Sequence, residues 1–186
     1  MPSGPGVISD ETAREIAASV PPAVASFLLT SRQNVTGIVE QQRFVRSGAL
    51  QIVDTLTGGT YQDLRAALPG ISLVQVIHVS DDESVEEALK VAPDVDAILL
   101  DSGNQRLPVK ILGGTGRAHD WTISRLIVEQ VKTPVFLAGG LNSENALDAV
   151  ERVEPFGLDV CSGVRTSGKL DERKLSAFFE QIRNFR

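Results

Sequence analysis

Asp101 is the residue of this sequence that we expect to exchange a proton with a ligand. It follows the apolar run at residues 95–100, at the carboxyl end of an expected strand. A carboxyl group at the rim of such a strand loses part of its hydration, which favours its protonated form and suits proton donation near neutral pH. Because strand-end aspartates often close a turn, the alternative is that Asp101 only caps the loop at residues 102–104.

Two pairs of small residues predict an anion-binding site. Gly139 and Gly140 follow the buried run at residues 135–138 and precede a helix start. Backbone N–H groups and the positive end of a helix dipole can therefore meet an anion there. Ser162 and Gly163 follow another apolar run in the same way. We interpret the two loops together as one phosphate site, although each glycine alone could serve only a tight turn.

Other reactive or glycine-rich positions give weaker signals. Gly113 and Gly114 belong to a Gly-Gly-Thr-Gly segment that lacks the Gly-Lys-Ser/Thr ending of a P-loop. His78 lies in an expected strand whose register points it either into the site or against a helix, and a structural role is the simpler interpretation. His119 is expected at the surface, and Cys161 is expected to be a small strand residue because no activating base lies near it in sequence.

Composition and charge narrow the class of protein. The 186 residues are 42% hydrophobic and carry a net charge of −6, which predicts one globular domain and argues against nucleic-acid and polybasic membrane partners. One cysteine and two histidines exclude an internal disulfide and make a metal site implausible. Neither a signal peptide nor a run of ~20 apolar residues is present, so we expect a cytoplasmic protein.

The elements that must position these residues alternate between strands and helices. Short apolar runs predict six strands, and capped amphipathic segments predict a helix after each of them and one before the first. Because the strands are apolar on both faces, they belong in a parallel sheet covered by helices. The expected strands are Val24–Leu29, Leu50–Val53, Leu73–Val79, Val95–Leu100, Val135–Ala138 and Leu158–Cys161. The expected helices after the first are Asn34–Gly48, Gly59–Leu68, Asp82–Val91, Asp120–Val131, Ser143–Val153 and Asp171–Asn184.

Two architectures share this alternation, the (β/α)8 barrel and the open doubly wound sheet. Six strands favour the open sheet. The sequence starts within an expected loop, and a helix follows that loop. This order favours a barrel that lacks its first β-α-β unit. We prefer the barrel, as one domain over residues 1–186, because polar and glycine residues gather after the last three strands, where barrel enzymes bind phosphate.

Four blocks of the carboxyl-terminal half together resemble the phosphoribosylanthranilate isomerase family. They are Ala97–Ser102, Gly113–Trp121, Pro134–Asn145 and Gly157–Val164. The family is a (β/α)8 barrel that performs an Amadori rearrangement of a phosphoribosyl aminobenzoate, without a cofactor, in tryptophan biosynthesis. The resemblance implies that Asp101 is the general acid. It also implies that Gly139, Gly140, Ser162 and Gly163 bind the substrate phosphate, and that Gly113 and Gly114 lie in a loop closing over the substrate.

The sequence departs from the family pattern in several places. The family's general base is a cysteine in a Lys-x-Cys-Gly motif of the first strand, and this sequence has no such motif. In the family, the arginine of a Ser-Pro-Arg motif holds the carboxylate of the substrate. This sequence reads Ser3-Gly-Pro-Gly6 at that place and has no arginine there. Gln51–Asp54 replaces Gln-Leu-His-Gly, while Gln75 and His78 replace a lysine and an arginine. Arg165 replaces an acidic residue.

Two explanations of these departures are open. Either the true start lies upstream, which we favour, or the chain is a reduced relative that has lost the isomerase reaction. The expected function is the isomerase, acting on a phosphosugar substrate without metal. The alternatives are an inactive phosphosugar-binding or interaction protein and another phosphosugar barrel enzyme. Exposed sheet edges would call for a second chain, such as a homo-oligomer partner, to cover them.

Overall fold

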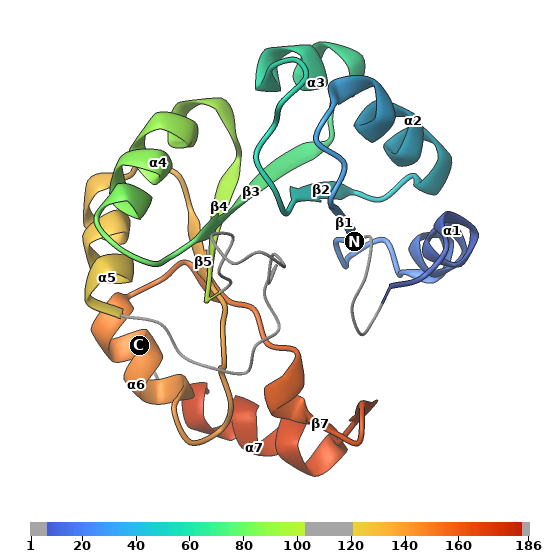
Figure 1. The fold of residues 1–186 in the computed structure, drawn as a ribbon. Helices are drawn as coiled ribbons and strands as arrows, with labels where there is room; N and C mark the ends of the chain where they lie inside the picture. The colour runs from blue at the N-terminus through green and yellow to red at the C-terminus, as the bar shows by residue number, and fades with distance from the viewer. Residues whose placement is uncertain (1–6, 103–120, 184–186) are drawn as a thin grey trace. The chain divides into compact units, whose positions relative to one another are not determined.

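The computed structural model describes residues 7–102 and 121–183, in which helices and strands alternate (Figure 1). The strands are β1 (Phe27–Thr30), β2 (Ala49–Ile52), β3 (Ser72–His78), β4 (Ala97–Asp101), β5 (Val135–Leu137), β6 (Gly157–Leu158), β7 (Arg165–Thr166) and β8 (Lys169–Leu170). The α-helices are α1 (Asp10–Ser19), α2 (Val35–Val45), α3 (Tyr61–Ala67), α4 (Glu83–Val91), α5 (Trp121–Gln130), α6 (Ala146–Val153) and α7 (Glu172–Ile182). Two 3-10 helices are η1 (Ala92–Asp94) and η2 (Ser162–Val164).

Strands β1 to β6 are hydrogen-bonded in chain order. The pairs β1–β2, β2–β3, β4–β5 and β5–β6 are parallel. The prediction of six strands in an α/β sheet is therefore confirmed. The chain divides into two compact units, one with residues up to Val76 and Asp94–Ala97, the other with Ile77–Pro93 and the residues from Ile98.

The first unit contains α1, β1, α2, β2, α3 and most of β3. Ser9 caps α1 by accepting a hydrogen bond from the Thr12 N–H at 3.2 Å. Alternate residues of β1 differ in exposure, because Leu28 and Thr30 are buried while Phe27 and Leu29 are 44% and 49% exposed. Residues of α1, β1 and α2 line a cavity of about 260 Å³ beside this first strand.

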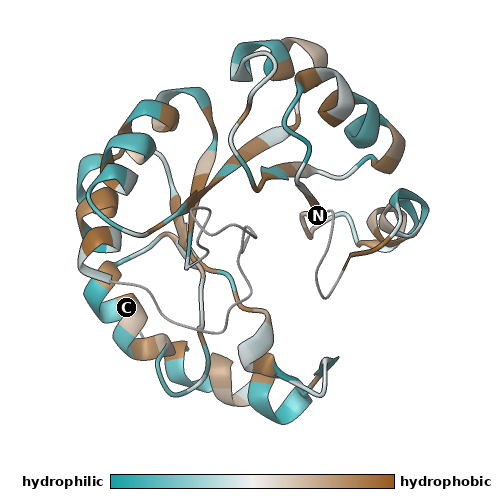
Figure 2. Ribbon diagram, viewed as in Figure 1, coloured by the Kyte–Doolittle hydropathy of each residue, from teal (hydrophilic) through white to brown (hydrophobic). Residues whose placement is uncertain are grey.

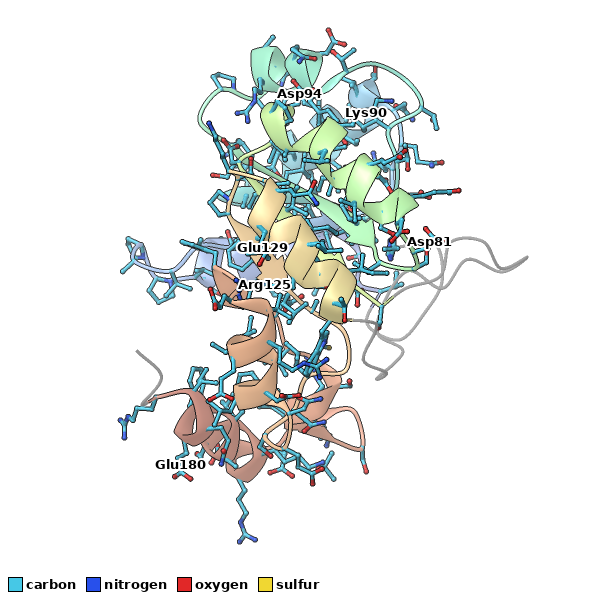
Figure 3. All side chains as sticks on the ribbon, turned by 90° about the vertical axis from the view of Figure 1, so that its left-hand side faces the viewer. Asp81, Lys90, Asp94, Arg125, Glu129 and Glu180 are labelled. Carbon is cyan, nitrogen blue, oxygen red and sulfur yellow. The ribbon has the colours of Figure 1, made fainter. Side chains whose placement is uncertain are left out.

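The second unit contains β4, β5, β6 and helices α4 to α7. Figure 2 shows hydrophobic residues along its strands and on part of each helix. Among its described residues, the largest completely buried side chains are those of Ile77, Ile98, Leu100, Ile127 and Leu137. Arg125 and Glu129 lie together on α5 (Figure 3), and their 2.7 Å ion pair extends to Glu154, 2.9 Å away, just after α6. Since these groups are exposed to solvent, the two pairs contribute little to stability.

Three differences from the predicted elements have local causes. Strand β1 begins at Phe27 rather than Val24, because the Val24 N–H donates to the Pro21 carbonyl at 2.9 Å and closes a turn. Helix α6 begins at Ala146 rather than Ser143. The antiparallel hairpin β7–β8 was not predicted, because its strands are two exposed residues each. Its turn at Ser167 and Gly168 has φ of 51° and 77°, typical of a two-residue hairpin.

Within residues 7–102 and 121–183, no helix combines the length and apolar character needed to cross a membrane.

Candidate active site

Asp101 is the last residue of β4 and lies at the carboxyl end of the sheet. Ile98 and Leu100 are completely buried, so alternation places Asp101 on the opposite face from them. Its side chain is half-buried, and one carboxylate oxygen accepts a hydrogen bond from the Ser102 N–H at 2.7 Å. Residues 103 and 104 of the loop that Asp101 was expected to cap lie outside the described residues.

The loop after β5 depends on two glycines. Gly139 and Gly140 have φ of 89° and 69°, a region that residues with a Cβ rarely adopt. A Cβ on Gly139 would come within 2.9 Å of Ser102, so this glycine also lets the loop pack against the end of β4. The predicted glycine pair is thus required by the local backbone, and it brings the loop beside Asp101.

Asparagine side chains hold this loop in place. Asn142 and Asn145 donate from their amides to the Gly140 carbonyl at 3.4 and 3.1 Å. Asn145 also accepts from the Asn142 N–H at 2.8 Å, and Asn142 accepts from the Glu144 N–H at 2.7 Å. The sequence predicted that the next helix would begin at Ser143. Instead these asparagines bond within the loop, which explains why α6 starts three residues late.

The loop after β6 touches the loop after β5. Ser162 is exposed and Gly163 half-buried in the short helix η2, whose first N–H groups have no partner within the helix. A Cβ on Gly163 would overlap the Leu141 carbonyl oxygen and come within 2.9 Å of the Asn142 Cβ. The structure thus brings the two predicted loops together, through a contact that requires glycine at position 163.

Asp159 is a site residue that the sequence reasoning missed. Its N–H donates to the Leu137 carbonyl at 2.8 Å, and the Ala138 N–H donates to the Leu100 carbonyl at 2.7 Å. In parallel sheets this pattern places Asp101, Ala138 and Asp159 in one row across β4, β5 and β6. The small side chain of Ala138 lies between the two carboxylates. The signal in the sequence was an acidic residue within a short apolar run, which we had treated as the middle of a strand.

The two carboxylates interact electrostatically. Burial raises the pKa of Asp159 above its usual 3.8, and the negative charge of Asp101 raises it further. Asp159 is exposed by total accessible area. We give the burial effect more weight, because protein atoms on one side of a carboxyl group limit its hydration even when its other side meets water. Asp159 therefore keeps a proton to higher pH than a free aspartate.

The structure also shows where other residues that were singled out in the sequence lie. His78 is 8% exposed at the end of β3. Cys161 is exposed and is a free thiol. Arg165 donates to the Gly168 carbonyl at 3.1 Å within the hairpin. Gly113, Gly114 and His119 lie outside the described residues. In the part of the chain that the structure describes, no three His, Cys, Asp or Glu side chains gather as metal ligands.

A Gly163→Ala substitution tests the contact between the two loops. The added methyl group would push Leu141 away, so we expect phosphate binding to weaken by at least about tenfold, equivalent to about 1.4 kcal/mol. Gly168→Ala is the matched control: it strains a backbone with φ of 77° by about 1–2 kcal/mol but meets no atom within 4 Å. Calorimetric titration with inorganic phosphate measures both, and equal affinities for the two variants would contradict a shared anion site.

An Asp159→Asn substitution tests the electrostatic interaction through stability. Between pH 3.8 and the raised pKa of Asp159, the folded state binds more protons than the unfolded state, so stability falls as pH rises through that window. The variant should melt at a higher temperature than the wild type at pH 7, with the difference shrinking toward pH 3.8. Asp171→Asn should have the opposite effect at pH 7, because a hydrogen bond from Thr166 lowers the pKa of Asp171. A lower melting temperature for Asp159→Asn at pH 7 would refute the interaction.

The comparisons with known proteins agree with this geometry. Residues 2–181 match the family described as N-(5'phosphoribosyl)anthranilate (PRA) isomerase. The isomerase of Methanocella arvoryzae is 36% identical over 180 residues, which cover 96% of this chain and 82% of that protein. The isomerase of Haloferax volcanii is 39% identical over 164 residues, covering 88% and 70%.

Solved structures give the same assignment. The isomerase of Thermotoga maritima superimposes with a TM-score of 0.78 and 27% identity, covering 99% of this chain and 85% of that chain. A second isomerase structure, in complex with reduced 1-(o-carboxyphenylamino)-1-deoxyribulose 5-phosphate, has a TM-score of 0.75 and 26% identity, with coverage of 99% and 84%. The predicted fold of TIM-barrel type is confirmed. The chain belongs to the N-(5'-phosphoribosyl)anthranilate isomerase family.

Proposed function

We propose that the row of Asp101 and Asp159, with the two glycine loops beside it, is the site at which this isomerase rearranges N-(5'-phosphoribosyl)anthranilate. The observation that carries the proposal is their common position at the carboxyl ends of β4, β5 and β6. Barrel enzymes build their active sites at this end of the strands. The reaction is an acid–base isomerisation of a sugar phosphate, so it requires an anion site and a proton donor side by side.

The loops after β5 and β6 are proposed to hold the substrate phosphate. Gly139, Gly140, Ser162 and Gly163 contribute backbone N–H groups, and α6 follows the first loop with the positive end of its dipole. The contact between Gly163 and Leu141 keeps the two sets of amides together. A related isomerase was solved with a phosphate-bearing, open-chain sugar, which is the kind of ligand that such a site fits.

Asp101 is proposed to be the general acid. Its proton goes to the ring oxygen of the ribose while the bond from C1 to that oxygen breaks, and the nitrogen lone pair forms the C=N bond of a protonated Schiff base. Loss of the C2 proton to a base then gives an enolamine. Protonation at C1, with loss of the proton from the C2 hydroxyl group, gives the ketosamine with its carbonyl at C2. Asp159 favours this chemistry by its position, because its carboxyl group faces the same substrate atoms from across Ala138.

An Asp101→Asn substitution tests the acid role. The amide cannot donate the required proton, so kcat should fall by at least ~10²-fold, whereas affinity for inorganic phosphate should stay within about threefold of wild type. Asp94→Asn is a matched control, since Asp94 (Figure 3) precedes β4 at the opposite end of the strand. Steady-state kinetics and calorimetry measure both quantities. Unchanged turnover in Asp101→Asn would eliminate Asp101 as the acid.

We also propose that a second copy of the chain covers β1. Phe27 and Leu29 are largely exposed beside an apolar cavity, and a strand edge of this kind invites pairing. The Thermotoga maritima isomerase is described as dimeric. Sedimentation equilibrium should show self-association that Phe27→Lys abolishes; a monomer at all concentrations would contradict the proposal.

For this biosynthetic reaction we propose a cytoplasmic location, which cell fractionation can test.

A further inference from the structure

His78 lies in the same row as the two carboxylates. The Val79 N–H donates to the Asp101 carbonyl at 2.9 Å, which places His78 directly beside Asp101 on the neighbouring strand. The row therefore reads His78, Asp101, Ala138 and Asp159 across β3, β4, β5 and β6. Residues in one row of a parallel sheet project from the same face.

The face on which His78 lies is settled by its neighbours. Ile77, the preceding residue, is completely buried, as is Leu100 before Asp101. Because side chains alternate along a strand, His78 and Asp101 both project from the face opposite to these two residues. The Ser84 hydroxyl of α4 donates to the backbone carbonyl of His78 at 3.4 Å and so helps to hold the strand end. The register therefore places the side chain of His78 on the same face as that of Asp101, which is one of the two orientations that the sequence left open.

The order of the strands matches the order of groups in the substrate. The phosphate loops follow β5 and β6, Asp101 ends β4, and His78 ends β3. The substrate carries its phosphate at one end, the reacting sugar atoms in the middle, and an aromatic carboxylate at the other end. Strands lie about 4.8 Å apart, so each group of the substrate can meet a successive strand end.

We propose that His78 is a substrate-binding residue that donates a hydrogen bond from its imidazole to the aromatic carboxylate of the substrate. This inference rests on the proposed function. It assigns a partner to the end of the ligand farthest from the phosphate loops.

Electrostatics favour a donor at this position. Asp101 from β4 and Asp159 from the segment after β6 are the acidic residues of the row, and both repel an incoming carboxylate when they are ionised. An imidazole offers an N–H donor in its neutral form and two in its charged form. A hydrogen bond from such a group to a carboxylate offsets the repulsion that the row would otherwise exert on the aromatic end.

The experiment compares the affinities of the wild-type protein and of its variants for two ligands that differ only in the aromatic carboxylate. The ligands are reduced 1-(o-carboxyphenylamino)-1-deoxyribulose 5-phosphate and the same compound without the carboxylate. Neither ligand can react, so calorimetry on the full chain gives dissociation constants without any turnover. The variants are His78→Ala and His78→Gln, the second of which keeps an amide donor. Gly163→Ala is the matched control at the phosphate end, because its added methyl group would disturb the contact between the two loops.

We expect His78→Ala to weaken binding of the carboxylate ligand by about tenfold, or about 1.4 kcal/mol, and to leave binding of the other ligand within about twofold. His78→Gln should recover part of the loss. Gly163→Ala should weaken the binding of both ligands equally, because both carry the phosphate. Thermal melts of each variant show whether it is folded. If His78→Ala does not fold, the dissociation constants of His78→Gln for the two ligands provide the test.

Two results would overturn the inference and are distinguishable. Equal losses for the two ligands in the folded His78 variants would show that the imidazole does not recognise the carboxylate, while leaving the phosphate site and Asp101 intact. Failure of the wild-type protein to bind either ligand would overturn the proposed function and this inference together.

Discussion

The site depends on the register of the backbone hydrogen bonds at the carboxyl ends of β3 to β6. Three bonds, from the N–H groups of Val79, Ala138 and Asp159, align one residue from each strand in a single row. A slip by one residue would move a side chain to the opposite face of its strand. The completely buried neighbours, Leu100 and Leu137, resist such a slip because the close-packed core around each of them fits that side chain. The packing of the core thus fixes the positions of the ionisable groups.

The neighbouring loops are fixed by a different constraint, which is the absence of side chains. Gly139 lets one loop approach Ser102, and Gly163 lets the other approach Leu141. The amides of Asn142 and Asn145 then hold the Gly140 carbonyl, so the loop keeps its shape without a ligand. The electrostatic arrangement opposes stability, since the raised pKa of Asp159 reflects an unfavourable interaction of the ionised carboxylate with its surroundings.

Apolar runs predicted the six strands, because strands buried on both faces carry a strong sequence signal. Asp101 and the glycine pairs were also found from sequence, since they directly follow such runs. Asp159 was missed because β6 ends at Leu158, three residues before the end of the predicted strand. The face of His78 could not be decided, since a period of two leaves the choice open until the buried partners of the strand are known. The start of α6 was misjudged because side-chain bonds within a loop compete with helix capping.

The most direct test of the account is the affinity of the wild-type protein for reduced 1-(o-carboxyphenylamino)-1-deoxyribulose 5-phosphate and for its dephosphorylated counterpart. Several charge-assisted hydrogen bonds from the two glycine loops are lost with the phosphate, each worth about 1.5–3 kcal/mol. We therefore predict that removal of the phosphate weakens binding by at least about 100-fold, or about 2.7 kcal/mol. Equal affinity for the two ligands would contradict the assignment of the loops, and with it the order of groups along the sheet.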